Sequence, residues 1–179
     1  MSSDTQRTHH LISQPQSGFT LMEVLITVLI LSVGLLGLAG LQFNALRSNQ
    51  SAAQSTIAVL RVIDAADRLR GNLAGVEDGS YDLLTGASED PGCIQNGCTS
   101  TQLAQYDNWS WNDQNENSLP DGEGVICLDS TPNDGDEAAA HGCDGQLSDG
   151  LRILAAKVWW DDDHNPDTDK RRHTMAITP

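Results

Sequence analysis

The sequence has little positive charge and few aromatic side chains. Among its 179 residues, 10 are Lys or Arg and 25 are Asp or Glu, which gives a formal net charge of −15 at pH 7, and aromatic residues make up 4%. A chain this acidic repels phosphate backbones, and it offers neither a basic stripe nor a platform for base stacking. The composition therefore argues against nucleic acid as a partner.

The sequence also lacks the motifs of common catalytic sites. It contains no G-x-S-x-G elbow, no H-E-x-x-H and no phosphate-cradling Gly loop. His141, His164 and His173 have polar neighbours in the sequence, which favours surface positions over a shared site. We therefore expect no enzymatic activity and no cofactor.

The charges are unevenly distributed along the chain. Residues 1–70 hold five basic and four acidic residues, whereas residues 71–179 hold five basic and 21 acidic ones, a net charge of −16. The first part is nearly neutral and apolar in its middle, and the second is polar and rich in Gly, Asn and Asp. We expect a two-part molecule in which residues 71–179 form an acidic head.

A long apolar run dominates the first part. From Phe19 to Leu41 the chain has 23 residues with one ionisable group, Glu23. As a helix this run reaches about 35 Å, enough to cross a bilayer core. A secretory signal peptide fits poorly because no A-x-A site follows, and a soluble core helix is rarely apolar on every face. We expect a membrane-spanning helix over residues 19–41, in which Glu23 is either functional or snorkels to the interface.

The helix is expected to continue through residues 42–70, because no Pro or Gly occurs there before Gly71. The spacing predicts that this half of the helix is amphipathic, with one face toward the core and one toward solvent. The predicted inward residues are Leu46, Ala53, Ile57, Leu60 and Ile63, and the predicted outward residues are Arg47, Gln54, Arg61 and Asp64. A coiled coil is an alternative, although no clean heptad is sustained. Gly34, Gly37 and Gly40 lie three apart and either allow close helix contacts or are ordinary small residues.

The head is expected to be small and mixed in structure. Residues 100–112 are typical of a short helix with Leu103, Tyr106 and Trp109 inward, and residues 120–124 have the composition of a turn. Strands are predicted over residues 125–128, 151–160 and 172–178. The fold class is therefore α+β, with a long N-terminal helix packed on a small C-terminal antiparallel sheet.

The segment Gly18-Phe19-Thr20-Leu21-Met22-Glu23-Val24-Leu25 resembles the class III leader junction of type IV pilins and type II secretion pseudopilins. The resemblance implies that residues 1–18 are a leader, that prepilin peptidase cuts between Gly18 and Phe19, and that Phe19 is then N-methylated. It also implies that Glu23 neutralises the N-terminal ammonium of a neighbouring subunit. Such leaders usually carry Lys or Arg near the cut, whereas here only Arg7, with His9 and His10, supplies positive character.

Within that family the chain is most similar to the PilV-type minor pilins. The resemblance is carried by residues 23–25, 34–42, 66–72, 102–107, 119–125 and 158–162. It implies a single-pass inner-membrane protein whose C-terminal part lies in the periplasm and which then enters a cell-surface type IV pilus. The implied partners are other minor pilins, the major pilin and a tip adhesin, and the implied roles are priming of assembly, adhesion and twitching motility. Two alternatives are a minor pseudopilin of a type II secretion system and an unprocessed periplasmic binding module.

Four cysteines, Cys93, Cys98, Cys127 and Cys143, all lie in the head. An even count in a part expected to face an oxidising periplasm favours two disulfides, for which three connectivities exist. Nearness in sequence favours Cys93–Cys98 and Cys127–Cys143. Zinc is the rival, because Cys93-x4-Cys98 is tolerable ligand spacing and His141 lies beside Cys143, but no paired C-x-x-C knuckle is present.

Two acidic segments could be read as calcium loops. One alternates Asp161, Asp163, Asn165, Asp167 and Asp169, and the other is residues 133–137, near Asp129. The first has Pro166 and Arg172 where an EF-hand loop needs Gly and Glu. We therefore expect solvated surface loops and no metal.

Overall fold

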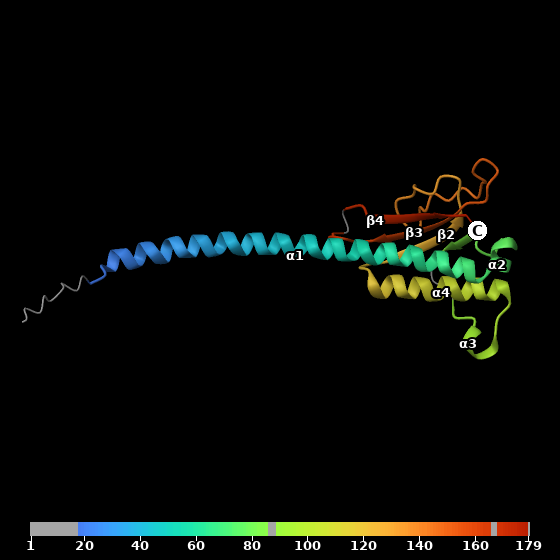
Figure 1. The fold of residues 1–179 in the computed structure, drawn as a ribbon, viewed down its shortest axis with the longest axis horizontal. Helices are drawn as coiled ribbons and strands as arrows, with labels where there is room; N and C mark the ends of the chain where they lie inside the picture. Colours follow the sequence, from blue (N-terminus) through green and yellow to red (C-terminus); the bar gives the residue numbers. More distant parts are fainter. Residues whose placement is uncertain (1–17, 86–88, 166–167, 179) are drawn as a thin grey trace, which may run out of the picture. The chain divides into compact units, whose positions relative to one another are not determined.

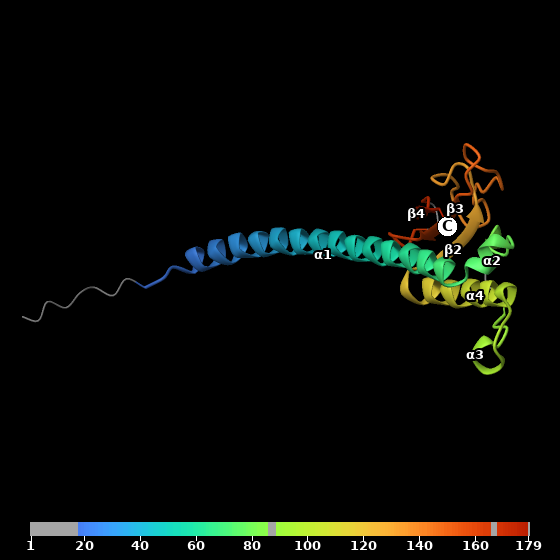
Figure 2. The same cartoon turned by 45° about the vertical axis from the view of Figure 1, so that its right-hand side comes forward.

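A computed structural model of the chain describes residues 18–85, 89–165 and 168–178. It separates into two compact units, with the boundary between Ala45 and Leu46. Its helices and strands are α1 (Leu21–Gly71), α2 (Leu73–Glu77), β1 (Leu83–Thr85), α3 (Cys93–Asn96), α4 (Ser100–Ser118), β2 (Glu123–Leu128), β3 (Leu154–Trp160) and β4 (Arg171–Ile177). Figures 1 and 2 show the course of the chain through these elements.

The four strands form one antiparallel sheet in the order β1-β2-β3-β4. β3 is paired over its whole length with β4, from Leu154 opposite Ile177 to Trp160 opposite Arg171. The predicted α+β fold is confirmed: the long N-terminal helix packs on a small antiparallel sheet. The three predicted strands are all present, although the strand expected from residue 151 begins at Leu154, because Ser148 and Leu151 close a tight turn by pairing their backbones across Asp149 and Gly150.

The side chains on both faces of β3 are buried. One face contributes to the main core together with the C-terminal part of α1, through residues such as Ile126, Ala156 and Val158. The other face carries Val125, Cys127, Ala155 and Trp159 and is covered in part by the segment after β2. Every residue of β3 is consequently buried, which agrees with a central strand.

The inward face of α1 differs from the predicted one. The buried residues of α1 are Gln54, Ala58, Val62, Ala65, Ala66 and Leu69. Leu46 and Leu60 are 69% and 58% exposed, whereas Ile57 packs partly against the core. The face that carries Ala58, Val62 and Ala65 belongs to the main core. The predictions of Gln54 as outward and Leu60 as inward are therefore both wrong.

The α4 helix is longer than predicted and turns a different face inward. It begins with a capping box in which the Thr99 side chain accepts a hydrogen bond from the backbone N–H of Gln102, and it ends at Ser118. Its buried residues are Ala104, Asp107, Asn108, Trp111, Asn112 and Asn115, whereas Leu103, Tyr106 and Trp109 are only half-buried. The inward face is therefore largely polar, which hydrophobic spacing could not indicate. Figures 1 and 2 show α4 running beside the C-terminal part of α1.

Candidate functional site

The predicted cleavage site lies directly before the first helix. Gly18, Phe19 and Thr20 have no regular secondary structure and are exposed. Thr20 caps α1, because its backbone carbonyl and its hydroxyl both accept the backbone N–H of Glu23, at 3.1 and 3.3 Å. A side chain added at Gly18 would meet nothing within 4 Å. The Gly18–Phe19 bond is thus reachable in an extended segment, and residues 1–17 of the predicted leader lie outside the described residues.

Glu23 lies in the first turn of α1. An acidic group there interacts favourably with the helix dipole. Its carboxylate forms no ion pair with any residue that the structure describes. Among the described residues the side chain is therefore free to meet a positive charge from outside its own chain, as the resemblance implies.

The apolar part of α1 has no packing partner among the described residues of its own unit, 18–45. Residues 21–45 are exposed throughout, including Leu36 at 74%. By length and composition α1 can cross a membrane. Gly34, Gly37 and Gly40 have open space around them. An exposed helix that is apolar on every side fits membrane anchoring.

The cysteines of the head form two disulfides. Cys93 pairs with Cys98 and Cys127 pairs with Cys143, with Cα–Cα distances of 5.0 and 6.2 Å. This is the pairing preferred from nearness in sequence. Cys127, Cys143 and Asp129 have potential ligand atoms within 4.8 Å of one another. However, a disulfide has no thiolate to offer, so the zinc alternative loses its sulfur ligands.

A buried ion-pair cluster lies beside the second disulfide. Lys157 and Asp129 both have fully buried side chains, and their charged atoms are 2.6 Å apart. The Lys157 ammonium also donates to the Asp134 carboxylate at 2.6 Å and to the backbone carbonyl of His141 at 2.8 Å. Desolvation raises the pKa of Asp134, but the hydrogen bond from Lys157 helps to hold that pKa below its ordinary value. The cluster fastens the segment after β2 to the outer face of the sheet.

Sequence reasoning missed this cluster, although a signal was present. Lys157 is the only charged residue in the strand sequence LAAKVWW. A single Lys on a strand with no polar alternation needs a buried anion, and the acidic segment at residues 129–137 supplies it. Asp129 and Asp134 therefore both pair with the Lys157 ammonium.

A second polar network joins α1, α2 and α4. The Tyr81 hydroxyl donates to Asp107 at 2.5 Å, and Arg68 donates to the other oxygen of Asp107 at 3.3 Å. Asn72 donates to the Tyr81 oxygen and to the backbone carbonyl of Ser100. Burial raises the pKa of Asp107, although the bonds from Tyr81 and Arg68 oppose this rise. Burial and the contact with Asp107 likewise raise the pKa of Tyr81.

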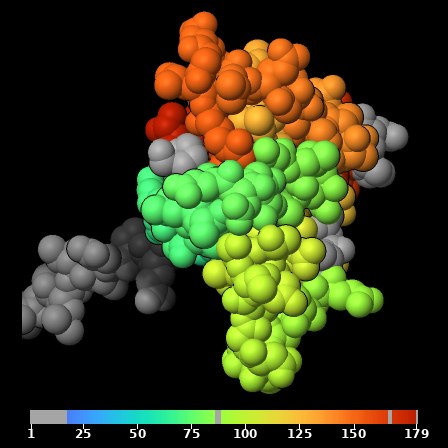
Figure 3. Space-filling view, turned by 90° about the vertical axis from the view of Figure 1, so that its right-hand side faces the viewer, coloured from blue at the N-terminus to red at the C-terminus, as the bar shows by residue number. Residues whose placement is uncertain are grey.

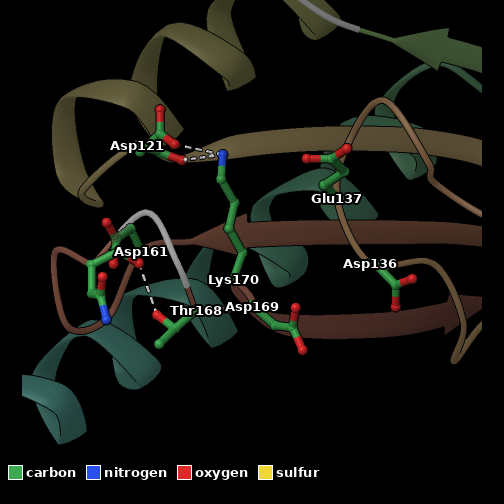
Figure 4. A pocket seen from close by; sticks show the side chains of 8 residues that line it. Asp121, Asp136, Glu137, Asp161, Thr168, Asp169 and Lys170 are labelled. Carbon is green, nitrogen blue, oxygen red and sulfur yellow. Dashed lines mark hydrogen bonds and ion pairs between the residues drawn. The ribbon is translucent and has the colours of Figure 1, made fainter.

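The acidic segments expected to be solvated line a hollow of about 450 Å³. Figure 4 shows Lys170 pointing to Asp121, while Asp136 and Glu137 come from the facing segment. Asp161 accepts the backbone N–H groups of Asp163 and His164, at 3.2 and 2.7 Å. Asp163 in turn accepts the Asn165 backbone and the Thr168 hydroxyl. These oxygens are engaged within the loop, and Asp167 lies outside the described residues.

The three histidines are separate. The Nδ1 atom of His141 accepts the backbone N–H of Cys143 at 3.0 Å. His164 lies in the loop between β3 and β4, and His173 lies on β4. Each belongs to a different local structure, and only His164 is exposed, whereas His141 and His173 are half-buried.

The comparisons with known proteins address the N-terminal part. Residues 13–39 match the family model of the prokaryotic N-terminal methylation motif. No curated protein matches the chain significantly, and no solved structure does. The matched region contains Gly18, Phe19, Glu23 and all but the last two residues of the apolar run. The chain thus carries the class III leader motif of type IV pilin-like proteins and pseudopilins, which implies processing by prepilin peptidase and assembly in a pilus or pseudopilus.

Proposed function

We propose that this chain is a minor pilin of a type IV pilus, similar to the PilV type, with a structural and not an enzymatic role. The observation that carries the proposal is the methylation motif on an exposed apolar helix that leads into a disulfide-bonded head. The leader is removed at Gly18–Phe19, Phe19 is N-methylated, and the helix moves from the inner membrane into the filament. The head lies in the periplasm before assembly.

In the filament, the apolar part of α1 packs among the helices of other pilins, and Glu23 pairs with the N-terminal amine of a neighbour. Two charges in an apolar bundle are tolerated when they are paired. The pilus assignment over a secretion pseudopilus is supported by the four head cysteines and by residues 66–70, where Arg68 joins the Tyr81–Asp107 network. With other minor pilins, this subunit primes assembly and supports a tip adhesin, and hence adhesion and twitching motility.

The test is the intact mass of the chain in sheared surface filaments. We expect a chain that begins at N-methylated Phe19 and is lighter by the four hydrogens of two disulfides. Detection of the mature chain only in the inner membrane would favour the type II secretion pseudopilus. A chain that retains Met1 in every fraction would contradict both assignments.

A matched pair of variants tests the processing step itself. Gly18→Val places a branched side chain at the bond that the peptidase must approach, whereas Gly18→Ala adds a single carbon. We expect the leader to be retained fully in Gly18→Val and partly in Gly18→Ala, as measured by the mass of the membrane-bound chain. Equal cleavage of both variants would place the cut elsewhere.

A further inference from the structure

The disulfide-closed turn at residues 91–98, called the α3 turn below, contributes nothing to the core. None of the residues of α3 is buried. Figures 1 and 2 show α3 lying beyond α4, away from the sheet, and Figure 3 shows this yellow-green segment projecting from the head. A disulfide at this place therefore does not hold the packed interior together.

The shape of the α3 turn is fixed by its own bonds. Cys93–Cys98 closes it, and three backbone hydrogen bonds lie inside it: Gln95 and Asn96 both donate to the Gly92 carbonyl, and Gly97 donates to the Cys93 carbonyl. Gly92 and Gly97 have φ values of 75° and 70°, which glycine adopts without strain. A projecting element that buries nothing and is nevertheless covalently held in one shape is preorganised for contact outside its own chain.

The chemistry of the α3 turn differs from that of the rest of the head. Ile94 is 78% exposed, the highest value among the large apolar residues of the head unit that the structure describes. Residues 91–106 contain no Asp, Glu, Lys or Arg, in a chain with a net charge of −15. The projecting part of an acidic head is thus uncharged and has an apolar side chain at its surface, flanked by the amides of Gln95 and Asn96.

We infer that the α3 turn inserts Ile94 into an apolar pocket on a different protein subunit of the same assembly, with Gln95 and Asn96 meeting uncharged polar groups at the rim. The inference deepens the proposed function, on which the choice of a subunit as partner rests. An anchor side chain that fills a pocket of the partner, within a ring of contacts that exclude water, is the anatomy of a binding hot spot.

Two other binding partners of the α3 turn fit the observations less well. A second copy of this chain carries the same net charge of −15, so two heads repel each other at short range. A membrane surface needs more apolar area or basic residues than one isoleucine on a turn without Lys or Arg supplies. A partner pocket with little charge of its own is the surface that this turn fits.

The test is site-specific photo-crosslinking of the full chain in intact cells. The photoreactive residue p-benzoylphenylalanine replaces Gln95 and is combined with native Ile94, Ile94→Val or Ile94→Asp. We expect an adduct with a different subunit, identified by mass spectrometry, that is retained in Ile94→Val and reduced about tenfold or more in Ile94→Asp. The same photoreactive residue at exposed Leu151, outside the turn, is the control position and should give little adduct.

The outcomes separate this inference from the proposed function. Equal adduct yields from Ile94→Asp and Ile94→Val, or adducts formed with a phospholipid or with a second copy, overturn the inference even when the mature chain is present in filaments. Absence of the mature chain from filaments overturns the proposed function, and with it the subunit as partner. The intact mass of each variant checks that both disulfides are present, so that loss of the adduct reports the side chain and not a disrupted turn.

Discussion

At the scale of single residues, Lys157 is a fully buried charge whose partners decide its effect on stability. It and Asp129 have fully buried side chains, and it also contacts Asp134. Truncation of one partner leaves a buried charge uncompensated, which costs about 3–5 kcal/mol. We expect Lys157→Met to lower the free energy of unfolding by that amount, as measured by denaturant titration of the full chain in detergent.

Lys170→Met is the matched control for Lys157→Met. Lys170 also contacts two carboxylates, those of Asp121 and Glu123, but these partners are 67% and 44% exposed. Ion pairs of this kind contribute about 1 kcal/mol or less. Similar losses in the two variants would mean that burial does not set the importance of Lys157. Restoration of part of the loss in Lys157→Met by Asp129→Leu would identify the unpaired charge as its cause.

Tyr81 offers a prediction that depends on pH. Burial raises the pKa of Asp107 above its ordinary value, against the bonds from Tyr81 and Arg68. Folding therefore favours the protonated acid, and the contribution of Asp107 to stability is largest below its unfolded pKa and falls as the pH rises through the raised folded value. In Tyr81→Phe the carboxylate loses a donor, which raises the pKa of Asp107 further.

We expect Tyr81→Phe to destabilise the head by about 1–3 kcal/mol when Asp107 is ionised and by less when it is protonated. The measurement is the difference in unfolding free energy between this variant and the wild type, at about pH 8 and at about pH 4.5. Tyr81 itself stays protonated over this range because its pKa is raised, and the two proteins share every other titrating group, so the change in this difference reports Asp107. A difference that grows as the pH falls would contradict the assignment.

At the scale of elements, the two disulfides support different structures. Cys127–Cys143 spans 16 residues and joins buried β2 to the segment held by Lys157, whereas Cys93–Cys98 spans five residues and closes a turn without buried residues. Loop closure predicts about 3 kcal/mol for the longer span. We expect Cys127→Ala/Cys143→Ala to lose about that much stability in denaturant titration.

Cys93→Ala/Cys98→Ala is the comparison variant. We expect a smaller loss, because the α3 turn can lose its order without unfolding the core, and hydrogen exchange should rise at residues 93–98 while β2 and β3 stay protected. A loss as large as that of the other pair would show that the α3 turn is coupled to the core. In that case the Cys93–Cys98 disulfide would support the packed interior and not contact outside the chain.

For the helices and strands, the sequence predicts the bounds better than the buried faces. Uninterrupted helical composition up to Gly71 predicted α1 within two residues at its start and one at its end, and the strand pattern around Lys157 predicted β3. The inward faces were wrong where packing chose small or polar residues. Ala58 faces inward in preference to Leu60, and Asn115 is buried while Trp109 is only half-buried. Hydrophobic spacing indicates which faces of a helix can be buried, but the tertiary packing around the helix decides which one is.

The candidate sites also differ in how far the sequence indicates them. Gly18, Phe19 and Glu23 could be read from the sequence because their motif is local and contiguous. The Lys157 cluster depends on β2–β3 pairing and on the return of the segment after β2, and the Tyr81–Asp107 network joins residues 26 apart. Such contacts follow from tertiary structure. A lone lysine on an apolar strand indicates that Lys157 has a buried anionic partner, but the sequence does not identify which residue that partner is.

At the scale of the whole molecule, the net charge of −15 sets how the protein responds to salt. Most of that charge lies in the head, and Asp136 and Glu137 face a hollow that is also lined by Asp161 and Asp169. Repulsion between such carboxylates opposes the compact state and is screened as ionic strength rises. The screening length falls from about 30 Å at 0.01 M to about 3 Å at 1 M.

We expect the thermal midpoint of the full chain in detergent at neutral pH to rise by a few degrees when sodium chloride is raised from about 0.01 M to about 1 M. Asp136→Asn/Glu137→Gln removes two exposed charges from the hollow and should raise the low-salt midpoint and reduce the salt effect. The buried Lys157–Asp129 pair is shielded from solvent and should respond little to salt. A midpoint that falls with salt would instead mean that the exposed ion pairs at Lys170 and Arg171 outweigh the repulsion, so the direction of the shift decides which of the two electrostatic effects governs the head.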